Sequence, residues 1–279
     1  MVKIAFQGER GAFSEDAAIK LFGKDIEFLP CIHLRDVFQM VVEDNTNFGV
    51  VPVENSQAGS INETYDLLLV YSLNIFAEII LKISHCLMAL PGQSLAGIKT
   101  IYSHPQALAQ CGEFLSKLKV NIVPSYDTAG SAKMIREGQL KQCAAIASKR
   151  AADIYALEVL APTIETNVNN YTKFFAISKQ KAKPAQKNKT SLVFATKNVP
   201  GALYSVLGTF ASRDINLTKL ESRPSKSKPW EYVFYADSEG HVDNQVYQEA
   251  IKELKQKTTF VKVLGSYPQA EQQLNHSTL

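Results

Sequence analysis

The chain is organised around one stretch, Asn167-Val168-Asn169-Asn170-Tyr171-Thr172-Lys173-Phe174-Phe175. Its asparagine-rich first half favours a turn, and the apolar residues that follow are typical of a buried strand. The loop delivers a hydroxyl (Thr172), a cation (Lys173) and an aromatic ring (Phe174) to the end of that strand. These groups suit an anionic, ring-containing substrate that loses an oxygen. A polar turn before an edge strand is the simpler interpretation of the same residues.

Length and composition limit the possible classes of protein. A chain of 279 residues predicts about two domains of ~150 residues each. With 46% hydrophobic residues it can bury a large core without disulfides or metals. The net charge of +3 is too small to indicate a nucleic-acid partner. Five lysines with no acidic residue between them predict a solvated linker over 179–189: Lys179, Lys181, Lys183, Lys187 and Lys189.

The cysteines indicate the redox state of the protein's compartment, and the longest apolar run tests for a membrane span. No Cys-x-x-Cys pair and no zinc pattern occurs, so we expect core thiols in a reducing compartment, at Cys31, Cys86, Cys111 and Cys143. Charged and polar residues interrupt the longest apolar run, Ile75 to Leu90, which argues against a membrane span. We therefore expect a cytoplasmic protein with no metal, no cofactor and no membrane partner.

The N-terminal third predicts a strand, turn and helix that form an anion-binding corner. Val2 to Phe6 is a short strand, and the glycine-containing turn Gly8 to Ser14 follows it, with Ser14 as the expected N-cap of a helix. The first amides of a helix lack internal partners and can bind anions. The glycines do not follow the dinucleotide-binding spacing.

A second candidate site follows the strand Phe48 to Val53. The polar loop Glu54 to Ser60 leaves the carboxyl end of this strand, where open α/β sheets bind ligands. A capped turn into the helix Asn62 to Leu69 explains the same residues equally well. Before them, the pattern predicts a strand at Glu27 to Cys31 and a helix at Leu34 to Val42.

Beyond an extended strand at Ile75 to Leu90, the alternation of strands and helices restarts. It predicts strands at Lys99 to Ser103, Asn121 to Pro124 and Ala144 to Ser148, with helices after Pro105 and Asp127. The helix after Pro105 carries one apolar stripe, at Leu108, Cys111, Leu115 and Leu118.

Two lobes of like construction, joined by crossings near 77–84 and 165–172, predict a clamshell with its ligand in the cleft. Helix starts after Phe13, Ser56, His104 and Asp127 would direct partial positive charge at a multiply charged anion. His104 itself is a candidate to orient or protonate a ligand, or a residue that ties the loop.

The last third predicts a smaller domain of a different kind. Strands at Thr190 to Lys197, Asn216 to Glu221, Tyr232 to Ala236 and Phe260 to Leu264 alternate with two helices. The first helix starts near Pro200, and the second buries one face, made of Val246, Tyr247, Ala250, Ile251 and Leu254. The order βαββαβ is the ferredoxin-like arrangement. Such a sheet often pairs with a copy of itself and binds a ligand at the seam; a plain dimerisation module is the alternative.

Six motifs, in order, resemble a known family. Four resemble monofunctional prephenate dehydratase: Gly8-Glu9-Arg10-Gly11-Ala12-Phe13-Ser14, Gly49-Val50-Val51-Pro52-Val53-Glu54-Asn55-Ser56, Ser103-His104-Pro105-Gln106-Ala107-Leu108 and Asn170-Tyr171-Thr172-Lys173-Phe174. Two resemble the phenylalanine-sensing ACT domain that follows it: Gly201-Ala202-Leu203-Tyr204-Ser205-Val206-Leu207 and Glu221-Ser222-Arg223-Pro224. The resemblance extends to about Tyr267.

The resemblance implies an α/β fold in which a two-lobed, periplasmic-binding-protein-like catalytic domain precedes a ferredoxin-like ACT domain. Expected borders are 1–178 for the catalytic domain (lobe one about 1–78 plus 170–178, lobe two about 79–169), 179–189 for the linker, 190–270 for the ACT domain and 271–279 for a tail. The implied reaction converts prephenate to phenylpyruvate with loss of water and carbon dioxide. The family also implies inhibition by phenylalanine and a homodimer, or a homotetramer that is a dimer of dimers.

Carried over to this sequence, the resemblance implies roles for particular residues. Thr172 is the candidate donor to the departing oxygen, and Phe174 would pack against the substrate ring or support the loop. The expected anchors of carboxylate and hydroxyl groups are Asn55, Ser56, Ser103 and Thr128. Lys173 stands where the family usually has arginine, so a two-pronged grip on a carboxylate is not expected, and Lys173 either binds substrate or supports the loop. Glu54 is an acid candidate or a capping residue.

The expected phenylalanine site lies at the start of the first helix of the smaller domain and on the strand after it. Its candidate residues are Gly201, Ala202, Leu203, Asn216, Leu217, Glu221 and Ser222. Helix amides would bind the effector's carboxylate, and Glu221 its ammonium. Two other functions stay open: arogenate dehydratase, which acts on the aminated analogue, and a non-catalytic sensor of amino acids or other solutes.

Overall fold

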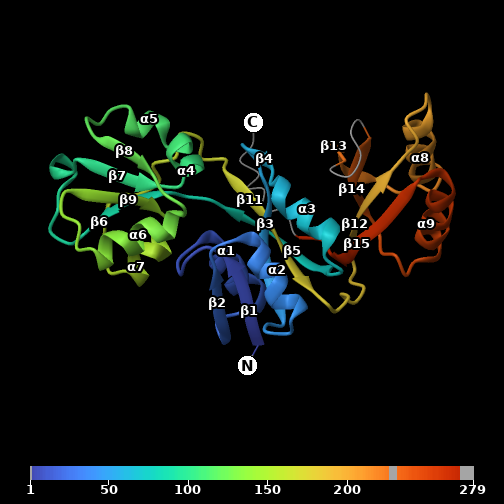
Figure 1. The fold of residues 1–279 in the computed structure, drawn as a ribbon, viewed down its shortest axis with the longest axis horizontal. Coiled ribbons are helices and arrows are strands. Elements are labelled where there is room, and N and C mark those ends of the chain that lie inside the picture. Colours follow the sequence, from blue (N-terminus) through green and yellow to red (C-terminus); the bar gives the residue numbers. More distant parts are fainter. Residues whose placement is uncertain (1, 226–230, 271–279) are drawn as a thin grey trace. The chain divides into compact units, whose positions relative to one another are not determined.

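The computed structural model describes residues 2–225 and 231–270, and the expected tail, 271–279, lies outside them. The chain forms two compact units. The first contains residues 1–64 and 79–174, and the second contains residues 65–78 and 175–279. Figure 1 labels the elements of both.

The first sheet has the strand order β2-β1-β3-β11-β5, and a short β4 pairs with β3. Its strands are β1 (Val2–Gln7), β2 (Ile26–Cys31), β3 (Phe48–Asn55), β4 (Gly59–Ser60), β5 (Asn74–Lys82) and β11 (Tyr171–Ser178). The helices between them are α1 (Phe13–Phe22), α2 (Leu34–Val42) and α3 (Asn62–Val70). β1 runs parallel to both β2 and β3, as apolar strands separated by helices require.

The second sheet has the order β10-β6-β9-β7-β8. Its strands are β6 (Cys86–Ala89), β7 (Thr100–Ser103), β8 (Asn121–Pro124), β9 (Cys143–Ala147) and β10 (Glu158–Ala161). Its helices are η1 (Leu95–Gly97), α4 (Pro105–Gln110), α5 (Gly112–Leu115), α6 (Thr128–Glu137) and α7 (Lys149–Ile154).

Helices cover both faces of this second sheet, and β9 shows why. Ala145 and Ala147 pack in a cluster with α6 and α7, whereas Ala144 and Ile146 pack in a cluster with α4 and α5. Successive side chains of a strand point to opposite faces, so an all-apolar strand needs cover on both. Figure 1 shows α6 and α7 on one side of the strands and α4 and α5 on the other.

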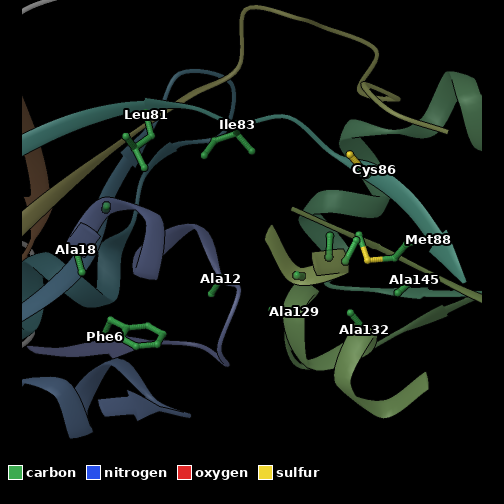
Figure 2. Close-up of a cluster of buried hydrophobic side chains, with 14 of the residues drawn as sticks. Phe6, Ala12, Ala18, Leu81, Ile83, Cys86, Met88, Ala129, Ala132 and Ala145 are labelled. Atoms are coloured by element: carbon green, nitrogen blue, oxygen red, sulfur yellow. The ribbon is translucent and has the colours of Figure 1, made fainter. Parts of the chain in front are cut away.

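One buried cluster contains side chains from both sheets of the first unit. Figure 2 shows Phe6 and Ala18 near the first sheet, Met88 and Ala132 near the second, and Ile83 on the segment between β5 and β6 that links them. The two halves also meet at the N-terminal turn. There Ser148 Oγ donates to Gly11 O (2.6 Å), and a Cβ on Gly11, whose φ is +88°, would lie 2.7 Å from Ala151 Cα. Only glycine fits this close contact.

The second unit contains the ferredoxin-like sheet, with the order β13-β14-β12-β15. Its elements are β12 (Asn188–Ala195), α8 (Ala202–Ala211), β13 (Leu217–Pro224), β14 (Tyr232–Glu239), α9 (Gln245–Lys257) and β15 (Phe260–Pro268). Side chains of α8 and α9 pack with Leu192 and Phe194 in one buried cluster. The predicted βαββαβ order is therefore confirmed.

Residues 65–78 join this second unit, although the sequence placed them in lobe one. The physical reason lies in β15. Lys262 Nζ donates to the carbonyls of Leu68, Leu69 and Tyr71, each at 2.9 Å, and so caps the C-terminal end of α3. Further along β15, a Cβ on Gly265 would lie 2.4 Å from Ile75 O, so the two backbones are in direct contact.

Three local predictions were wrong. Ser14 is not the N-cap of α1: the cap is Ala12, and no side chain caps this end. The helix after Pro105 breaks at Cys111 into two short helices, α4 and α5. The run from Ile75 to Leu90 forms two strands, β5 and β6.

Three further differences concern burial and strand length. Val246 is 45% exposed and does not share the buried face of α9. Lys189 is not in a solvated linker: it is 7% exposed, and its Nζ lies 2.6 Å from Glu78 Oε1. β3 continues to Asn55, so Glu54 and Asn55 belong to a strand and not to a loop.

Candidate functional site

A cavity of about 370 Å³ lies within the first unit, lined by residues of both its sheets and their helices. Small-molecule sites usually measure ~300 to 1,000 Å³. Its lining includes the starts of five helices: Phe13 and Ser14 of α1, Leu34 of α2, Glu63 of α3, Gln106 of α4 and Thr128 of α6. The sequence predicted α2 but did not place its start among the four that converge on the cleft, and the start expected after Ser56 lies at Asn62. Unpaired amides at helix starts favour an anion.

Thr172 and Asn55 form the polar centre of the lining. Asn55 Oδ1 accepts from two backbone amides, those of Gln57 and Ala58, each at 3.0 Å. Those donors fix the orientation of the Asn55 amide, so its NH₂ group faces Thr172 and donates to Thr172 Oγ1 at 3.0 Å. Thr172 therefore receives a hydrogen bond, and its own proton is available for a group in the cavity.

Three more side chains hold this pair in place. Asn55 Nδ2 also donates to Asn170 Oδ1 (2.7 Å), and Asn170 Nδ2 donates to Gln110 Oε1 (2.9 Å). His85 Nε2 lies 2.9 Å from the same Gln110 oxygen, which makes Nε2 the protonated ring nitrogen. The backbone amide of His85 donates to Glu165 Oε2 (2.9 Å). The network orders the amides around Thr172, and such networks make a site rigid.

The strand geometry of β11 separates Lys173 from its neighbours. Alternate residues of a strand share a face, and Thr172 and Phe174 both line the cavity. Lys173, between them, is not part of the lining and forms an ion pair with Glu54, Nζ to Oε2 at 3.0 Å. Lysine at this position therefore links β11 to β3.

The structure brings together Asn55, Thr128, Thr172 and Phe174, but not the other predicted anchors. Ser103 is fully buried, and its hydroxyl donates to Ile146 O (2.6 Å). The hydroxyl of Ser56 joins two turns: it donates to Asn169 O (3.2 Å) and accepts from Tyr171 N (3.0 Å). Neither serine lines the cavity.

Burial is the largest cause of the pKa shifts of His85, His104 and Asp127 in the lining. Burial lowers the pKa of His85, although Gln110 and Glu165 act in the opposite direction. Burial also lowers the pKa of His104, against Asp127, and His104 Nδ1 accepts from Gln106 N (3.2 Å) as the N-cap of α4. Both rings are neutral at pH 7, and His104 ties its loop. Burial raises the pKa of Asp127, although hydrogen bonds from the backbone amides of Gly130 and Glu9 act in the opposite direction.

The lining carries no lysine or arginine among the residues that the structure describes. A bound anion there depends on helix starts and neutral donors. Within the same residues, no group of three or more His, Cys, Asp or Glu side chains could hold a metal ion. No helix in the described ranges is long and apolar enough to cross a bilayer.

Sequence reasoning missed Gln110 and His85, and it assigned no role to Asn170. Their signal was present but weak. Gln110 is a polar residue beside the apolar stripe of its helix, and His85 interrupts an apolar run. Only the fold shows that Asn170 and Gln110 meet at Asn55 and that His85 contacts Gln110, because these pairs lie 25 to 115 residues apart.

The predicted phenylalanine-binding residues lie in the second unit. Gly201, with φ +80°, is the N-cap of α8, and no side chain caps this end. Ala202 N already donates to Val199 O (3.2 Å), so the expected set of unpaired amides is smaller by one. Leu217, Glu221 and Ser222 lie on β13, and Asn216 precedes it. Glu221 forms an ion pair with Lys219 (3.2 Å).

Comparisons with known proteins agree with this architecture. A family model described as "Prephenate dehydratase" matches residues 4–182, and one described as "ACT domain" matches residues 190–256. The bifunctional chorismate mutase/prephenate dehydratase of Aquifex aeolicus is 42% identical, covering 96% of this chain and 74% of the relative. The arogenate dehydratase/prephenate dehydratase 2 of Arabidopsis thaliana is 41% identical, covering 96% of this chain and 73% of the relative.

Two solved structures are similar over nearly the whole chain. The prephenate dehydratase of Arthrobacter aurescens in complex with L-Phe is 32% identical, with a TM-score of 0.88 over 96% of this chain and 90% of that one. GqqA, described as a novel type of quorum quenching acylase, is 33% identical, with a TM-score of 0.86 over 97% of this chain and 98% of that one. The chain therefore belongs to the prephenate dehydratase family of lyases, and its second part is an ACT domain.

Proposed function

We propose that this protein converts prephenate to phenylpyruvate and that Thr172 assists the departure of the ring hydroxyl. The observation that carries the proposal is the hydrogen bond from Asn55 Nδ2 to Thr172 Oγ1 (3.0 Å). It occupies a lone pair of the hydroxyl and leaves the proton for a substrate oxygen in the cavity. A threonine hydroxyl does not ionise at neutral pH, so Thr172 acts as a hydrogen-bond donor.

The proposed reaction balances without a cofactor. The ring carboxylate leaves as carbon dioxide, and the electron pair of its broken carbon–carbon bond makes the ring aromatic. The bond from the ring to the hydroxyl breaks at the opposite carbon, and the oxygen departs as hydroxide, which takes a proton from the solvent to become water. Negative charge grows on that oxygen as the bond breaks. A donor that is already oriented lowers the barrier because it needs no reorganisation.

The helix starts in the cavity lining support binding of the substrate's two carboxylates. Each start carries roughly half a positive charge at its end. Thr128 begins α6, and Phe13 and Ser14 begin α1 on the other half of the unit. Phe174, 2% exposed, supplies an apolar surface beside Thr172. We propose Asn55 and Thr128 as substrate contacts, and we assign Ser56, Ser103 and Lys173 to support of the surrounding loops.

The assay follows phenylpyruvate formation from prephenate by the purified protein. Thr172→Ala removes the donor and should lower kcat about 10²- to 10³-fold. Thr172→Ser keeps a hydroxyl and should retain most of the activity. Circular dichroism controls for folding. An active wild type together with an unimpaired Thr172→Ala would show that the donor is misassigned, whereas an inactive wild type would refute the reaction.

Arogenate dehydratase is the second candidate. Arogenate carries an ammonium group, and two acidic side chains, Glu63 and Asp127, line the cavity without a lysine or arginine among the described lining residues. Comparison of kcat/KM for prephenate and arogenate decides between the two substrates. A ratio that strongly favours arogenate would replace the prephenate assignment and leave the role of Thr172 unchanged.

The acylase activity described for GqqA has less support here. A hydroxyl nucleophile needs a base that takes its proton. Among the described residues, the hydrogen-bond partner of Thr172 Oγ1 is the amide NH₂ of Asn55, which donates a proton and cannot accept one. The same contact that suits a hydrogen-bond donor is therefore unsuited to a nucleophile.

We also propose phenylalanine inhibition through residues 190–270, with 1–178 as the catalytic domain and a linker that ends where β12 begins at Asn188. The start of α8 offers an uncapped helix end for the effector's carboxylate, and Glu221 offers a carboxylate for its ammonium. Inhibition requires that phenylalanine bind one state of the protein more tightly than another. Calorimetric titration with phenylalanine tests this, and absence of binding would remove the regulatory claim.

A homodimer, or a homotetramer built as a dimer of dimers, completes the proposal. β13 is an edge strand of the described sheet, and Leu220 on it (42%) and Tyr232 on the neighbouring β14 (44%) are exposed. Tyr204 of α8 is also exposed (82%). Open edges and exposed apolar residues favour pairing with another copy. Sedimentation with and without phenylalanine measures the assembly, and a monomer at micromolar concentration under both conditions would contradict it.

A further inference from the structure

Glu9, in the N-terminal turn, makes three contacts with one short segment of the half that contains the second sheet. Its Oε2 lies 3.0 Å from Lys133 Nζ, and its Oε1 accepts from the Tyr126 hydroxyl (3.2 Å). Its backbone amide donates to Asp127 Oδ2 (3.2 Å). Because 117 to 124 positions separate Glu9 from these partners, no local pattern in the sequence indicates the contacts.

The partners of Glu9 are themselves fixed to α6. A Cβ on Gly130 would lie 2.5 Å from the Tyr126 hydroxyl oxygen, so the Tyr126 ring packs directly on the helix. Asp127 is the N-cap of α6 and accepts from Gly130 N (2.9 Å). Lys133 lies on the same helix, and its hydrogen bond to Glu9 raises its pKa. One carboxylate and one amide of the N-terminal turn therefore hold the first half of α6.

Both ends of this connection lead to the candidate active site. Glu9 shortly precedes Phe13, which begins α1, and Phe13 and Ser14 line the cavity. Thr128 begins α6 and lines the cavity from the other half. These are the two helix starts assigned above to the substrate's carboxylates. Their separation has to match the spacing of those carboxylates, because binding depends on the orientation of both contacts at once.

We propose that Glu9 is a positioning residue for substrate binding, which sets the separation of the α1 and α6 starts without touching the substrate. Glu9 does not belong to the cavity lining. The same turn is also held by Ser148, the N-cap of α7, whose hydroxyl donates to Gly11 O (2.6 Å). Loss of the Glu9 side chain therefore loosens α6 and leaves the two halves joined. The role rests on the proposed binding of two carboxylates at these helix starts.

The first test measures KM and kcat of Glu9→Ala with prephenate or arogenate, both of which carry two carboxylates. These groups are bound before and during the reaction, so KM should rise about tenfold while kcat stays within about threefold of wild type. The urea midpoint should move little, because partly exposed ion pairs contribute little stability. Glu27→Ala removes another carboxylate paired with a lysine (3.6 Å) and, as the matched control, should keep the wild-type KM. An unchanged KM for Glu9→Ala, or a fall in kcat as large as the rise in KM, would overturn the role.

A charge exchange separates positioning from a general loss of structure. Lys133→Glu places two carboxylates together and should raise KM more than Glu9→Ala does, because like charges repel. The double variant Glu9→Lys/Lys133→Glu restores the ion pair in reverse and should recover most of the wild-type KM. A double variant whose KM is no better than that of Lys133→Glu would refute the positioning role.

Binding of an unreactive ligand makes the test independent of turnover. Benzylsuccinate carries a ring and two carboxylates, and calorimetric titration measures its Kd. Glu9→Ala should weaken its binding about tenfold, and the charge-exchanged double variant should restore it. If wild type is inactive but benzylsuccinate follows this pattern, the proposed reaction fails and the role of Glu9 stands. A wild type that binds neither substrate nor benzylsuccinate, or a Glu9→Ala variant that binds benzylsuccinate as wild type does, would overturn that role.

Discussion

Asn55→Asp is the sharpest perturbation of the candidate active site, because it changes one donor group into an acceptor at almost constant shape. Asn55 Nδ2 donates to Thr172 Oγ1 (3.0 Å) and to Asn170 Oδ1 (2.7 Å), while Oδ1 accepts from two backbone amides. Aspartate keeps the two hydrogen bonds accepted from the backbone amides and loses the two that Nδ2 donates. A carboxylate beside Thr172 then attracts the hydroxyl proton, which turns away from the cavity.

The expected loss in kcat follows from the lost donor, and the expected loss in unfolding free energy follows from the unpaired acceptor. One preorganised donor is worth about 10²- to 10³-fold in kcat, so Asn55→Asp should approach the effect of Thr172→Ala. The acceptor left at Asn170 Oδ1 should cost ~1 to 3 kcal/mol of unfolding free energy. Burial raises the pKa of the new carboxyl group, and the protonated acid donates again. Residual activity should therefore rise as the pH falls through that pKa.

The assay combines kcat for phenylpyruvate formation with urea denaturation. Because the two residues act as one unit, the double variant Asn55→Asp/Thr172→Ala should have the kcat of Thr172→Ala alone. Asn169→Asp, at an exposed position just before β11, is the matched control and should retain wild-type kcat. A near-normal kcat for Asn55→Asp, or losses that multiply in the double variant, would refute the argument.

The other predictions concern charges that the fold places away from the cavity. Lys173→Met should change kcat less than about fivefold, because Lys173 pairs with Glu54 and does not line the cavity. A loss of kcat as large as that of Thr172→Ala in the same assay would contradict this prediction. Lys189→Met leaves the Glu78 carboxylate buried without its cation, so the free energy of unfolding, measured by urea denaturation, should fall by about 3 to 5 kcal/mol. The double variant Lys189→Met/Glu78→Leu should recover most of this stability. Equal losses in the two variants would refute the pairing. Burial raises the pKa of Asp16 to about 6 in the folded protein. Between pH 4 and 6 the folded state therefore binds more protons than the unfolded state, and the contribution of this group to the free energy of unfolding falls as the pH rises. Asp16→Asn should therefore raise Tm relative to wild type more at pH 7 than at pH 4, and a shift independent of pH would count against that assignment.

Much of the fold could be predicted because local patterns determine it. The apolar runs at β1, β3 and β9 and the periodic stripes of α2 and α9 identify strands and helices without tertiary information. The errors occurred where tertiary contacts override local preference. Ser14 resembles an N-cap, but the tight approach of Gly11 to Ala151 fixes where α1 begins. The lysine run resembles a solvated linker, yet Glu78 holds Lys189 inside.

The candidate site was predictable only in part. Thr172 and Phe174 were recognisable from their motif, and their shared strand face follows from the period of two residues. Lys173 was the ambiguous residue, and the same period places it on the other face. Ser103 belongs to a matching motif, but its hydroxyl is consumed by Ile146 O. A motif names residue types, whereas hydrogen-bond partners decide which of them are available to a ligand.

The sequence by itself determined the order of the elements and the family, because these depend on periodicity and on runs of neighbouring residues. The tertiary structure alone decided which groups surround the Thr172 hydroxyl, and so the proton direction that we propose. That direction depends on Asn55, Asn170 and Gln110, which hydrogen-bond across 55 to 117 intervening positions of the chain. Backbone amides at Gln57 and Ala58 orient the Asn55 side chain, and no local pattern encodes that orientation.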